Sequence, residues 1–296
     1  MELRQLQALL AVVEEGSFTA AADVLHTVQS NVSTHLRALE AELGVPLVVR
    51  TRRGALPTEA GRYVIERARR IRREVDLIGE DLAALAGLRV GRATLGVVGT
   101  ASRWLVPALV TQLRDEAPGI RLRISEGASE RLMADVAAGE LAQAVVTEPV
   151  RDERLETLHL LDETLVGLAP AGFRTAAGGL ALAEVARLPL ILPLAGNPLR
   201  DEIEAAARSA GVELDVRTEV EGIRLIAELV AAGTGTAILP ETALPPRLDG
   251  LVRFEIPDLP PRRLALVADR RTPRSRADEV TRAAVLGIVA RHRAQE

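Results

Sequence analysis

Apolar residues near the start of the chain recur with helical spacing in three short segments, at residues 3–14, 17–25 and 27–43. Gly16 and Gly44 follow the first and third segments, as expected where a helix ends on a left-handed residue. Three helices within the first 44 residues, with a tight junction near residues 26–28, are typical of a helix-turn-helix. In that motif the third helix lies in the major groove of DNA.

Hydroxyl side chains precede the second and third segments. We expect Ser17 or Thr19 to cap the second helix and Thr27 to cap the third, because a side-chain oxygen there accepts a hydrogen bond from a free backbone N–H. Ala21 and Ala22 are small enough to let the second helix approach its neighbours closely.

The third segment carries hydrogen-bonding side chains on the face opposite its apolar one. At 100° per residue, that face and its flanks hold Gln29, Ser30, Asn31, Ser33, Thr34 and Arg37. Amides, hydroxyls and one Arg suit base edges and phosphates, whereas an ordinary solvated helix more often carries Glu and Lys. Taken alone this face also fits any exposed helix, and the next segment changes the balance toward DNA.

A basic hairpin is expected after the third helix. Two short strands, at residues 45–49 and 55–57, flank a turn rich in Arg. Arg52 and Arg53 at its tip would enter a minor groove or grip phosphate. Three helices and a hairpin together predict a winged helix-turn-helix over residues 1–58.

A long helix is expected over residues 59–87. Its apolar positions form a heptad seam of Val64, Ala68, Ile71, Val75, Ile78, Leu82 and Leu85. A helix of about 28 residues extends ~42 Å and outruns a small domain, so self-pairing in a dimer is favoured over packing on the chain's own core. A dimer places two reading helices on one duplex, at a site with dyad symmetry.

Beyond residue 91 the pattern changes to strands that alternate with helices, which is typical of α/β domains with a parallel sheet. The expected strands are at residues 93–98, 120–125, 143–147, 165–168, 190–193, 214–218, 236–239 and 263–268, and the final helix is at 275–291. The predicted fold is therefore an α+β chain of two parts, a winged helix-turn-helix with a long linker helix and then a two-lobed α/β domain. The expected boundaries are 1–58 for the DNA-binding domain, 59–87 for the linker helix and 88–296 for the two-lobed domain, with lobe I at about 92–161 and 267–296 and lobe II at about 162–266.

The chain of 296 residues has a net charge of −4, but the average hides a basic segment. Every basic residue is Arg, and nine Arg against two Glu between Arg50 and Arg73 give a local net charge of +7. For the run from Arg67 to Arg73, a solvated helix face and phosphate contact are about equally good explanations.

Composition excludes several kinds of chemistry. The chain has no Cys, which excludes a disulfide scaffold, a thiolate metal site, a Cys nucleophile and a thiol redox switch. Its four His have no metal-binding spacing and no Gly-x-Ser-x-Gly elbow occurs, so we expect no metal, no cofactor and no enzymatic activity. We find neither a signal peptide nor an uncharged stretch of ~18 residues, and expect a cytoplasmic protein with no membrane partner.

Residues 1–65, especially the stretch GSFTAAADVLHTVQSNVSTHLRALEAELGVPLVVRTRRGALPTEAG, resemble the DNA-binding segment of LysR-type transcriptional regulators. Downstream, the effector-binding region of that family is similar to GRATLGVVGTASRWLVPALV, APGIRLRISEG, AAGELAQAVVTEP and LVAAGTGTAILP, so the resemblance covers nearly the whole chain. It implies a winged helix-turn-helix, a dimeric coiled-coil linker, and a two-lobed domain similar to periplasmic binding proteins, often assembled as tetramers.

The resemblance also implies that an effector in the cleft alters DNA bending and transcription. The implied partners are double-stranded DNA, a small-molecule effector and further copies of the chain, with RNA polymerase left open. Gln29 and Ser30 match the family's start of the recognition helix, and Arg53 matches its wing Arg. Three positions depart from the family pattern: Thr34 where a basic residue is frequent, Val28 in place of Ser, and Ala142 in place of Asp.

The sensing site is expected beyond the carboxyl ends of the strands, where helix N-termini also point. This rule selects Thr100, Ala101, Ser102, Gly127, Ser129, Thr147, Pro193, Gly196, Asn197, Glu221 and Gly222. Their hydroxyls, amides and backbone N–H groups suit a small anion, typically a carboxylate, held between the lobes. Helix capping is the alternative for Ser102, Ser129 and Asn197. Arg103 and Arg200 either neutralise the anion or face solvent.

The leading hypothesis is a ligand-responsive DNA-binding regulator that assembles as a dimer or tetramer. A second hypothesis is a small-molecule binding or enzyme module in which the first 87 residues only dimerise, although the sequence shows no recognisable nucleophile and base. A third is a DNA-binding protein whose cleft binds nothing.

Overall fold

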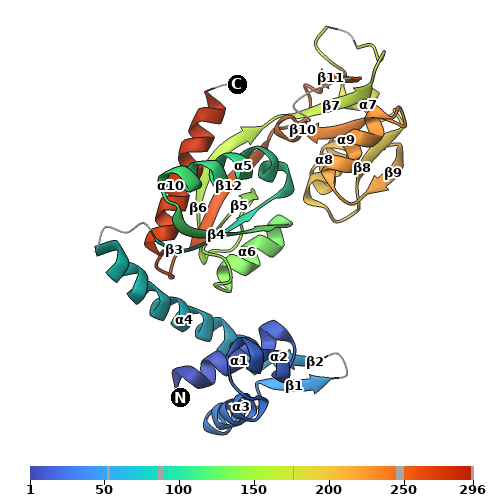
Figure 1. The fold of residues 1–296 in the computed structure, drawn as a ribbon. Coiled ribbons are helices and arrows are strands. Elements are labelled where there is room, and N and C mark those ends of the chain that lie inside the picture. Colours follow the sequence, from blue (N-terminus) through green and yellow to red (C-terminus); the bar gives the residue numbers. More distant parts are fainter. Residues whose placement is uncertain (52–53, 86–89, 176, 245–249, 295–296) are drawn as a thin grey trace. The chain divides into compact units, whose positions relative to one another are not determined.

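The structure is a computed structural model that describes residues 1–51, 54–85, 90–175, 177–244 and 250–294. The chain divides into two compact units, one of Met1–Leu88 with Ala138–Glu140 and one of Arg89–Ala137 with Leu141–Glu296. Figure 1 draws the elements of both units. The predicted DNA contacts Arg52 and Arg53 lie outside the described residues.

The first unit is a winged helix-turn-helix, as predicted. Its elements are α1 (Leu3–Glu15), α2 (Phe18–Val24), α3 (Gln29–Leu43), β1 (Val48–Thr51), β2 (Gly54–Pro57) and α4 (Glu59–Leu85). Strands β1 and β2 pair antiparallel, with Val48 opposite Pro57, and form the wing (Figure 1).

Leucines from α1 and α3 and from the start of the wing meet α4 in the core of this unit. The buried members are Leu6, Leu9, Leu10, Leu36, Leu39, Leu47, Ile65 and Ala68. A second cluster joins α1, α2 and α3 and includes the buried Ala21 and Ala22, whose small side chains let α2 pack closely. The hydrophobic faces predicted for the three helices are therefore the ones that pack.

One of the two predicted helix caps is present. The Ser17 hydroxyl accepts hydrogen bonds from the backbone N–H groups of Thr19 and Ala20 and so caps α2. The prediction that Thr27 caps α3 was wrong, because Val28 holds the cap position and has no side-chain oxygen. The Thr27 hydroxyl instead accepts a hydrogen bond from the Asn31 amide, 3.0 Å away.

The first wing strand begins three residues later than predicted. The backbone N–H groups of Leu47 and Val48 donate to one carboxylate oxygen of Glu40 on α3, at 2.7 and 3.2 Å. These bonds hold the segment before β1 against α3, so the ladder starts at Val48.

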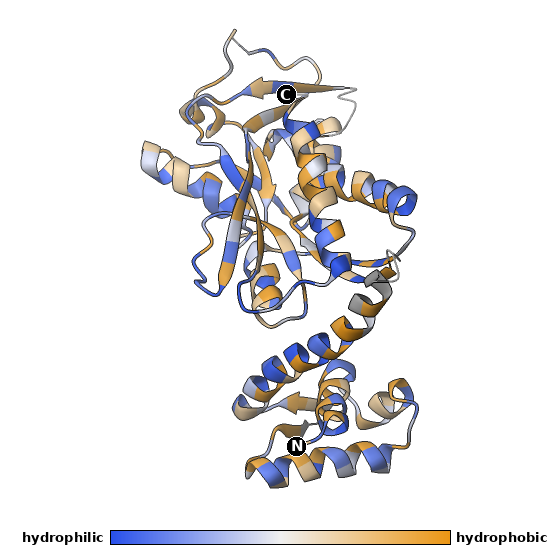
Figure 2. Ribbon diagram, turned by 90° about the vertical axis from the view of Figure 1, so that its left-hand side faces the viewer, coloured by the Kyte–Doolittle hydropathy of each residue, from blue (hydrophilic) through white to orange (hydrophobic). Residues whose placement is uncertain are grey.

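Helix α4 starts in the core and continues as an exposed seam. Ala68 is buried and Val64 packs against the same cluster, so the first two seam positions contact the unit's own core. Ile71, Val75, Ile78 and Leu82 are 39, 42, 62 and 64% exposed. Figure 2 shows orange and blue residues alternating along this helix. The side chain of Leu85 is outside the described part of the chain.

Some of the Arg run on α4 is paired within the unit. Arg70 contacts Glu66 at 2.8 Å and Arg72 contacts Glu14 of α1 at 3.2 Å. Arg62 and Arg67 are exposed. Ion pairing therefore accounts for part of the run, and Arg62 and Arg67 remain available for phosphate.

The second unit is a two-lobed α/β domain, as predicted. Lobe I has a five-stranded sheet in the order β4-β3-β5-β12-β6. Its strands are β3 (Val90–Val97), β4 (Gly119–Glu126), β5 (Gln143–Thr147), β6 (Leu155–Glu163) and β12 (Arg262–Asp269), and its helices are α5 (Gly99–Glu116), α6 (Ser129–Ala137) and α10 (Arg276–Arg293).

The prediction of a parallel sheet was only partly right. Strands β3, β4 and β5 are parallel, whereas β12 runs antiparallel to both β5 and β6. The cause is the connection, because β12 brings the chain back from the other lobe. All of β12 belongs to the lobe I sheet, so the chain has returned by Arg262 rather than near the expected residue 267.

Lobe II contains two small sheets around its own core. Its elements are β7 (Leu165–Pro170), α7 (Leu182–Val185), β8 (Leu190–Pro193), α8 (Pro198–Ala210), β9 (Val216–Val220), α9 (Ile223–Ala231), β10 (Ala237–Pro240), the short 3₁₀ turn η1 (Glu241–Ala243) and β11 (Leu251–Glu255). Strands β10, β7 and β11 pair antiparallel, and β8 pairs parallel with β9. Strands β6 and β11 and helix α7 were not among the predicted elements.

Candidate functional sites

The predicted reading face of α3 is exposed, with one exception. Gln29, Ser30, Asn31, Thr34 and Arg37 are all exposed. Ser33 is only 3% exposed, and its hydroxyl accepts a hydrogen bond from the Gln29 amide at 3.3 Å. The assignment of Ser33 as a DNA contact was therefore wrong, because this flank of the helix turns toward the core.

The remaining polar groups of this face are held by local hydrogen bonds. The Thr34 hydroxyl donates to the Ser30 carbonyl at 2.8 Å, and the Asn31 amide donates to Thr27. For Arg37 the described part of the chain offers neither a hydrogen bond nor an ion pair. The face is thus preformed, with a guanidinium ready for an external acceptor.

The wing is fixed to the helices through the backbone of Gly54. This residue has φ of 115°, and a Cβ built on it would lie 2.4 Å from the Gly16 carbonyl oxygen. The next N–H, that of Ala55, donates to the same carbonyl at 2.8 Å. Only glycine fits here, so the end of α1 sets the position of the hairpin.

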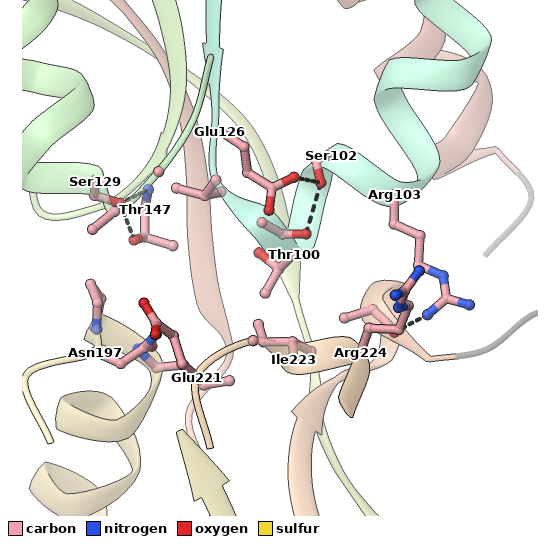
Figure 3. A pocket seen from close by; sticks show the side chains of 18 of the residues that line it. Thr100, Ser102, Arg103, Glu126, Ser129, Thr147, Asn197, Glu221, Ile223 and Arg224 are labelled. Carbon is pink, nitrogen blue, oxygen red and sulfur yellow. Dashed lines mark hydrogen bonds between the residues drawn. The ribbon is translucent and has the colours of Figure 1, made fainter. Parts of the chain in front are cut away.

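In the second unit, a pocket of about 770 Å³ lies between the two lobes (Figure 3). Four helices begin at its wall, namely α5, α6, α8 and α9. Helix N-termini carry unpaired N–H groups and partial positive charge. Their convergence makes the pocket attractive to an anion.

Eight of the eleven predicted effector residues line this pocket: Thr100, Ser102, Gly127, Ser129, Thr147, Asn197, Glu221 and Gly222. Ala101, Pro193 and Gly196 do not. Ala101 is fully buried in the lobe I core, because helix α5 turns its side chain inward. Pro193 is the buried last residue of β8 and contributes only its carbonyl, which accepts from Arg200. Gly196 belongs to the turn before α8 but does not reach the pocket wall.

Hydroxyl groups line the lobe I side. The hydroxyls of Ser129 and Thr147 are 2.7 Å apart, and the Thr147 N–H donates to Ser129 at 3.0 Å. The hydroxyl of Thr100 is buried and has no hydrogen-bond partner among the described residues. A buried hydroxyl normally has a partner, so a ligand is a natural acceptor or donor for it.

Helix capping was the alternative for Ser102, Ser129 and Asn197, and the structure shows it only for Asn197. Asn197 caps α8, since its side-chain oxygen accepts from the Leu199 N–H at 3.0 Å. The Ser102 hydroxyl contacts a Glu126 carboxylate oxygen at 2.6 Å and the Gly99 carbonyl at 3.0 Å. Ser129 bonds with Thr147 across to β5.

The charged residues of the pocket were mostly missed by sequence reasoning. Arg103, Arg224 and Arg262 line it together with Glu126 and Glu221, and Arg262 is also paired with Glu163 and Glu202. In the view of Figure 3, Arg103 and Arg224 appear on the right of the pocket and Ser129 and Thr147 on the left. Arg103 also donates to the Ala243 carbonyl at 3.3 Å.

The other Arg for which two roles were open, Arg200, is structural. It is 8% exposed and contacts Glu204 at 2.6 Å and Glu219 at 3.3 Å. These ion pairs hold α8 onto β9 beside the pocket, so Arg200 neither lines the pocket nor faces solvent.

A buried charge cluster sits where the chain crosses between the lobes. Arg262 begins β12 opposite Glu163 at the end of β6, and its Nε lies 3.6 Å from Glu163 and 3.4 Å from Glu202 of α8. Thr242 of η1 donates to Glu163. Burial raises the pKa of the Glu202 carboxyl, which Arg262 partly offsets and Glu163 reinforces.

Arg262 joins this cluster to two cavities. It lines the interlobe pocket and also a second cavity of about 720 Å³ beside α8. Its Nε and Nη1 are buried without hydrogen-bond acceptors in the described structure.

Within residues that the structure describes, no helix is long and apolar enough to span a membrane. The same residues contain no group of three or more His, Asp or Glu side chains arranged to hold a metal ion.

Two family models match the chain. Residues 3–62 match the bacterial regulatory helix-turn-helix protein of the lysR family, and residues 86–287 match the LysR substrate binding domain. Together they span both units.

Known relatives agree with these matches. The chain is 31% identical to a probable hydrogen peroxide-inducible genes activator of Mycobacterium leprae, over 88% of this chain and 86% of the relative. It is 30% identical to the DNA-binding transcriptional dual regulator OxyR of Escherichia coli, over 96% and 94%. The solved structure of a full-length OxyR variant from Pseudomonas aeruginosa has the same fold, with a TM-score of 0.78 and 26% identity over 96% of this chain and 94% of that one.

These matches exclude the enzyme hypothesis, because the family consists of regulators. The chain belongs to the LysR family and is a DNA-binding transcriptional regulator with an effector-binding domain.

Proposed function

We propose that this regulator reads DNA through the exposed face of α3 and that a small anion in the interlobe pocket is its effector. The observation that carries the proposal is the convergence of four helix N-termini and three Arg on one pocket, in a chain that also presents a preformed polar helix face.

On the DNA side, Gln29, Ser30, Asn31, Thr34 and Arg37 are proposed to contact bases and phosphates in the major groove. Amide side chains suit adenine and a guanidinium suits guanine or phosphate. Arg52 and Arg53, assigned from the sequence alone, are proposed to contact the minor groove or the backbone beside it.

On the effector side, the proposed contacts are the eight predicted residues that line the pocket, joined by Arg103, Arg224 and Arg262. The partial positive charge of the helix N-termini favours an anion in this pocket, and Arg103 and Arg224 add two guanidinium groups to its wall. A carboxylate would accept hydrogen bonds from the Thr100 hydroxyl, from whichever of Ser129 and Thr147 does not donate to the other, and from the N–H groups at the helix starts. Glu126 and Glu221 repel an anion, so the favoured ligand is an anion that also carries a hydrogen-bond donor for one of these carboxylates.

We further propose a dimer formed through the exposed seam of α4, which delivers two α3 helices to a dyad-symmetric site. Two such dimers would make a tetramer. Contact with RNA polymerase, and action in the cytoplasm where bacterial DNA is found, belong to the same proposal.

The DNA assignment is tested by gel shift on the regulator's own upstream region. Gln29→Ala and Arg37→Ala should each weaken binding about fivefold or more, since a base contact contributes ~1–3 kcal/mol. Arg114→Ala removes an exposed Arg from the other unit and should bind like the parent. Parent-like affinity of both α3 variants would show that another surface reads DNA.

The effector assignment is tested by thermal shift with matched pairs of small carboxylates and their amides. A ligand that binds the folded state raises Tm, so carboxylates alone should do so. Thr100→Val, which removes only the buried hydroxyl, should reduce the shift. If only amides or amines stabilise, the pocket does not select anions. If no compound raises Tm, the result favours the third hypothesis, a DNA-binding protein whose cleft binds no ligand.

A further inference from the structure

The side chain at the centre of the α3 reading face is a threonine whose hydroxyl is already engaged. Thr34 is exposed, and its Oγ1 donates to the Ser30 carbonyl one turn earlier at 2.8 Å. A hydroxyl that bonds back to the i−4 carbonyl turns toward its own helix. The γ-methyl group is then the outward part of this short side chain.

Ser30 and Asn31 lie on the N-terminal side of Thr34 on that face, and the side toward the C-terminus of α3 is more apolar. Ala38 lies one turn later and Ala41 follows on the same side, and both are exposed. Between Thr34 and Ala41 the only polar side chain on the face is Arg37. From Thr34 to Ala41 the reading face therefore presents methyl groups beside a single guanidinium.

We propose that the Thr34 methyl group reads the C5-methyl of a thymine in each half-site, with Ala38 packed alongside. The inference rests on the proposed entry of α3 into the major groove. Thymine alone carries a methyl group on that edge, and Thr and Ala methyl groups are its usual apolar contacts. Donating to guanine or adenine N7 would require Thr34 to break its bond to Ser30.

The experiment begins with in vitro selection of sites by the full-length protein from random duplexes. Each enriched thymine is then replaced by deoxyuridine, which removes only the methyl group. One thymine per half-site should be sensitive, with a loss of about fourfold, the value of one buried methyl.

Two variants separate the methyl from the hydroxyl. Thr34→Ser keeps the hydroxyl and loses the methyl, so it should bind the thymine site about fourfold more weakly per half-site. Its affinity should not change further when that thymine is replaced by deoxyuridine. Thr34→Val keeps the methyl and should stay as sensitive as the parent. Thr111→Ser, at an exposed helical threonine of the other unit, is the matched control.

The inference is overturned if selection enriches no thymine, or if Thr34→Ser retains parental sensitivity at every thymine. It is equally overturned if Thr34→Val loses binding and Thr34→Ser does not, because the hydroxyl would then be the reader. Failure of the wider proposal looks different, since Arg37→Ala and Gln29→Ala would then also bind like the parent.

Discussion

At the scale of single residues, Glu202 has an environment that disfavours its charge. Its side chain is 30% exposed, and it shares Arg262 with Glu163, whose side chain is fully buried. One guanidinium therefore faces two carboxylates, and Glu163 opposes ionisation of Glu202. Burial is the larger cause of the raised pKa.

Glu202→Gln should therefore raise the Tm of the protein at neutral pH by a few degrees at most. A carboxyl with a raised folded pKa binds a proton more readily when folded, so its ionisation costs stability above that pKa. The gain should shrink as the pH falls through the raised pKa, where Glu202 becomes protonated and resembles Gln.

Thermal unfolding of parent and variant across pH measures this difference. Asp201→Asn, an exposed carboxylate on the same helix, should give no comparable gain. A lower Tm for Glu202→Gln at neutral pH would mean that attraction to Arg262 outweighs burial.

Among the residues that line the pocket, those that follow a strand were predicted from the sequence, and Arg262, which begins one, was not. Thr100, Ser129 and Thr147 were found because a local rule places ligands at carboxyl strand ends. Arg262 reaches the pocket from the first residue of β12, and Arg224 from the first turn of α9. Arg224 and Arg262 line the pocket because the two lobes pack together, and the local sequence carries no signal of that packing.

At the scale of elements, helical periodicity was the most reliable guide. Helices α1, α3 and α4 were predicted because their apolar positions recur over several turns. Strand β6 was missed, since its sequence LETLHLLDE alternates poorly and carries exposed residues within it. Strand β6 pairs with β12, about a hundred residues later in the chain, and the local sequence pattern does not reveal such a distant partner.

Helix α4 also shows what periodicity leaves open. The heptad pattern correctly marked an apolar seam, but it could not divide the seam between the unit's own core and a partner. Ala68 packs in the unit's own core, whereas Ile71, Val75, Ile78 and Leu82 are exposed.

Ile78→Asp and Leu82→Asp should dissociate the proposed dimer, because each places a charge in an apolar seam. Sedimentation velocity should show a shift toward monomer, accompanied by weaker binding to the two-half-site duplex. Asp76→Arg, a charge change on an exposed position of the same helix off the seam, should leave assembly unchanged. Unaltered assembly of both seam variants would place the dimer contact elsewhere.

At the scale of the whole molecule, the chain departs from relatives that are named for hydrogen peroxide. Peroxide acts on proteins most readily through cysteine thiolates, and this chain has none. Its two Met are Met1 and Met133, and neither lines the interlobe pocket.

Low doses of hydrogen peroxide should therefore leave its DNA mobility shift unchanged. The measurement compares treated and untreated full-length protein, with a cysteine-containing relative treated in parallel. A changed mobility of this protein at a dose that changes the relative's mobility would contradict this expectation.

The order of parts along the chain was predictable, and the mixed sheet was not. Strand β12 follows lobe II in sequence and completes the lobe I sheet in reverse direction. Nothing local in residues 262–269 distinguishes a parallel from an antiparallel partner, because a buried strand is apolar in both cases.

Contact between the exposed side of α3 and base edges is the central claim, and site-specific crosslinking tests it most directly. Because the chain has no native cysteine, Ser30→Cys introduces a single thiol, which is offered a selected duplex with a disulfide-tethered base in the major groove. The account predicts rapid crosslinking at one position per half-site, with none for Glu15→Cys at the exposed end of α1. Equal crosslinking of the two variants, or none at Ser30→Cys in a complex that forms normally, would contradict it.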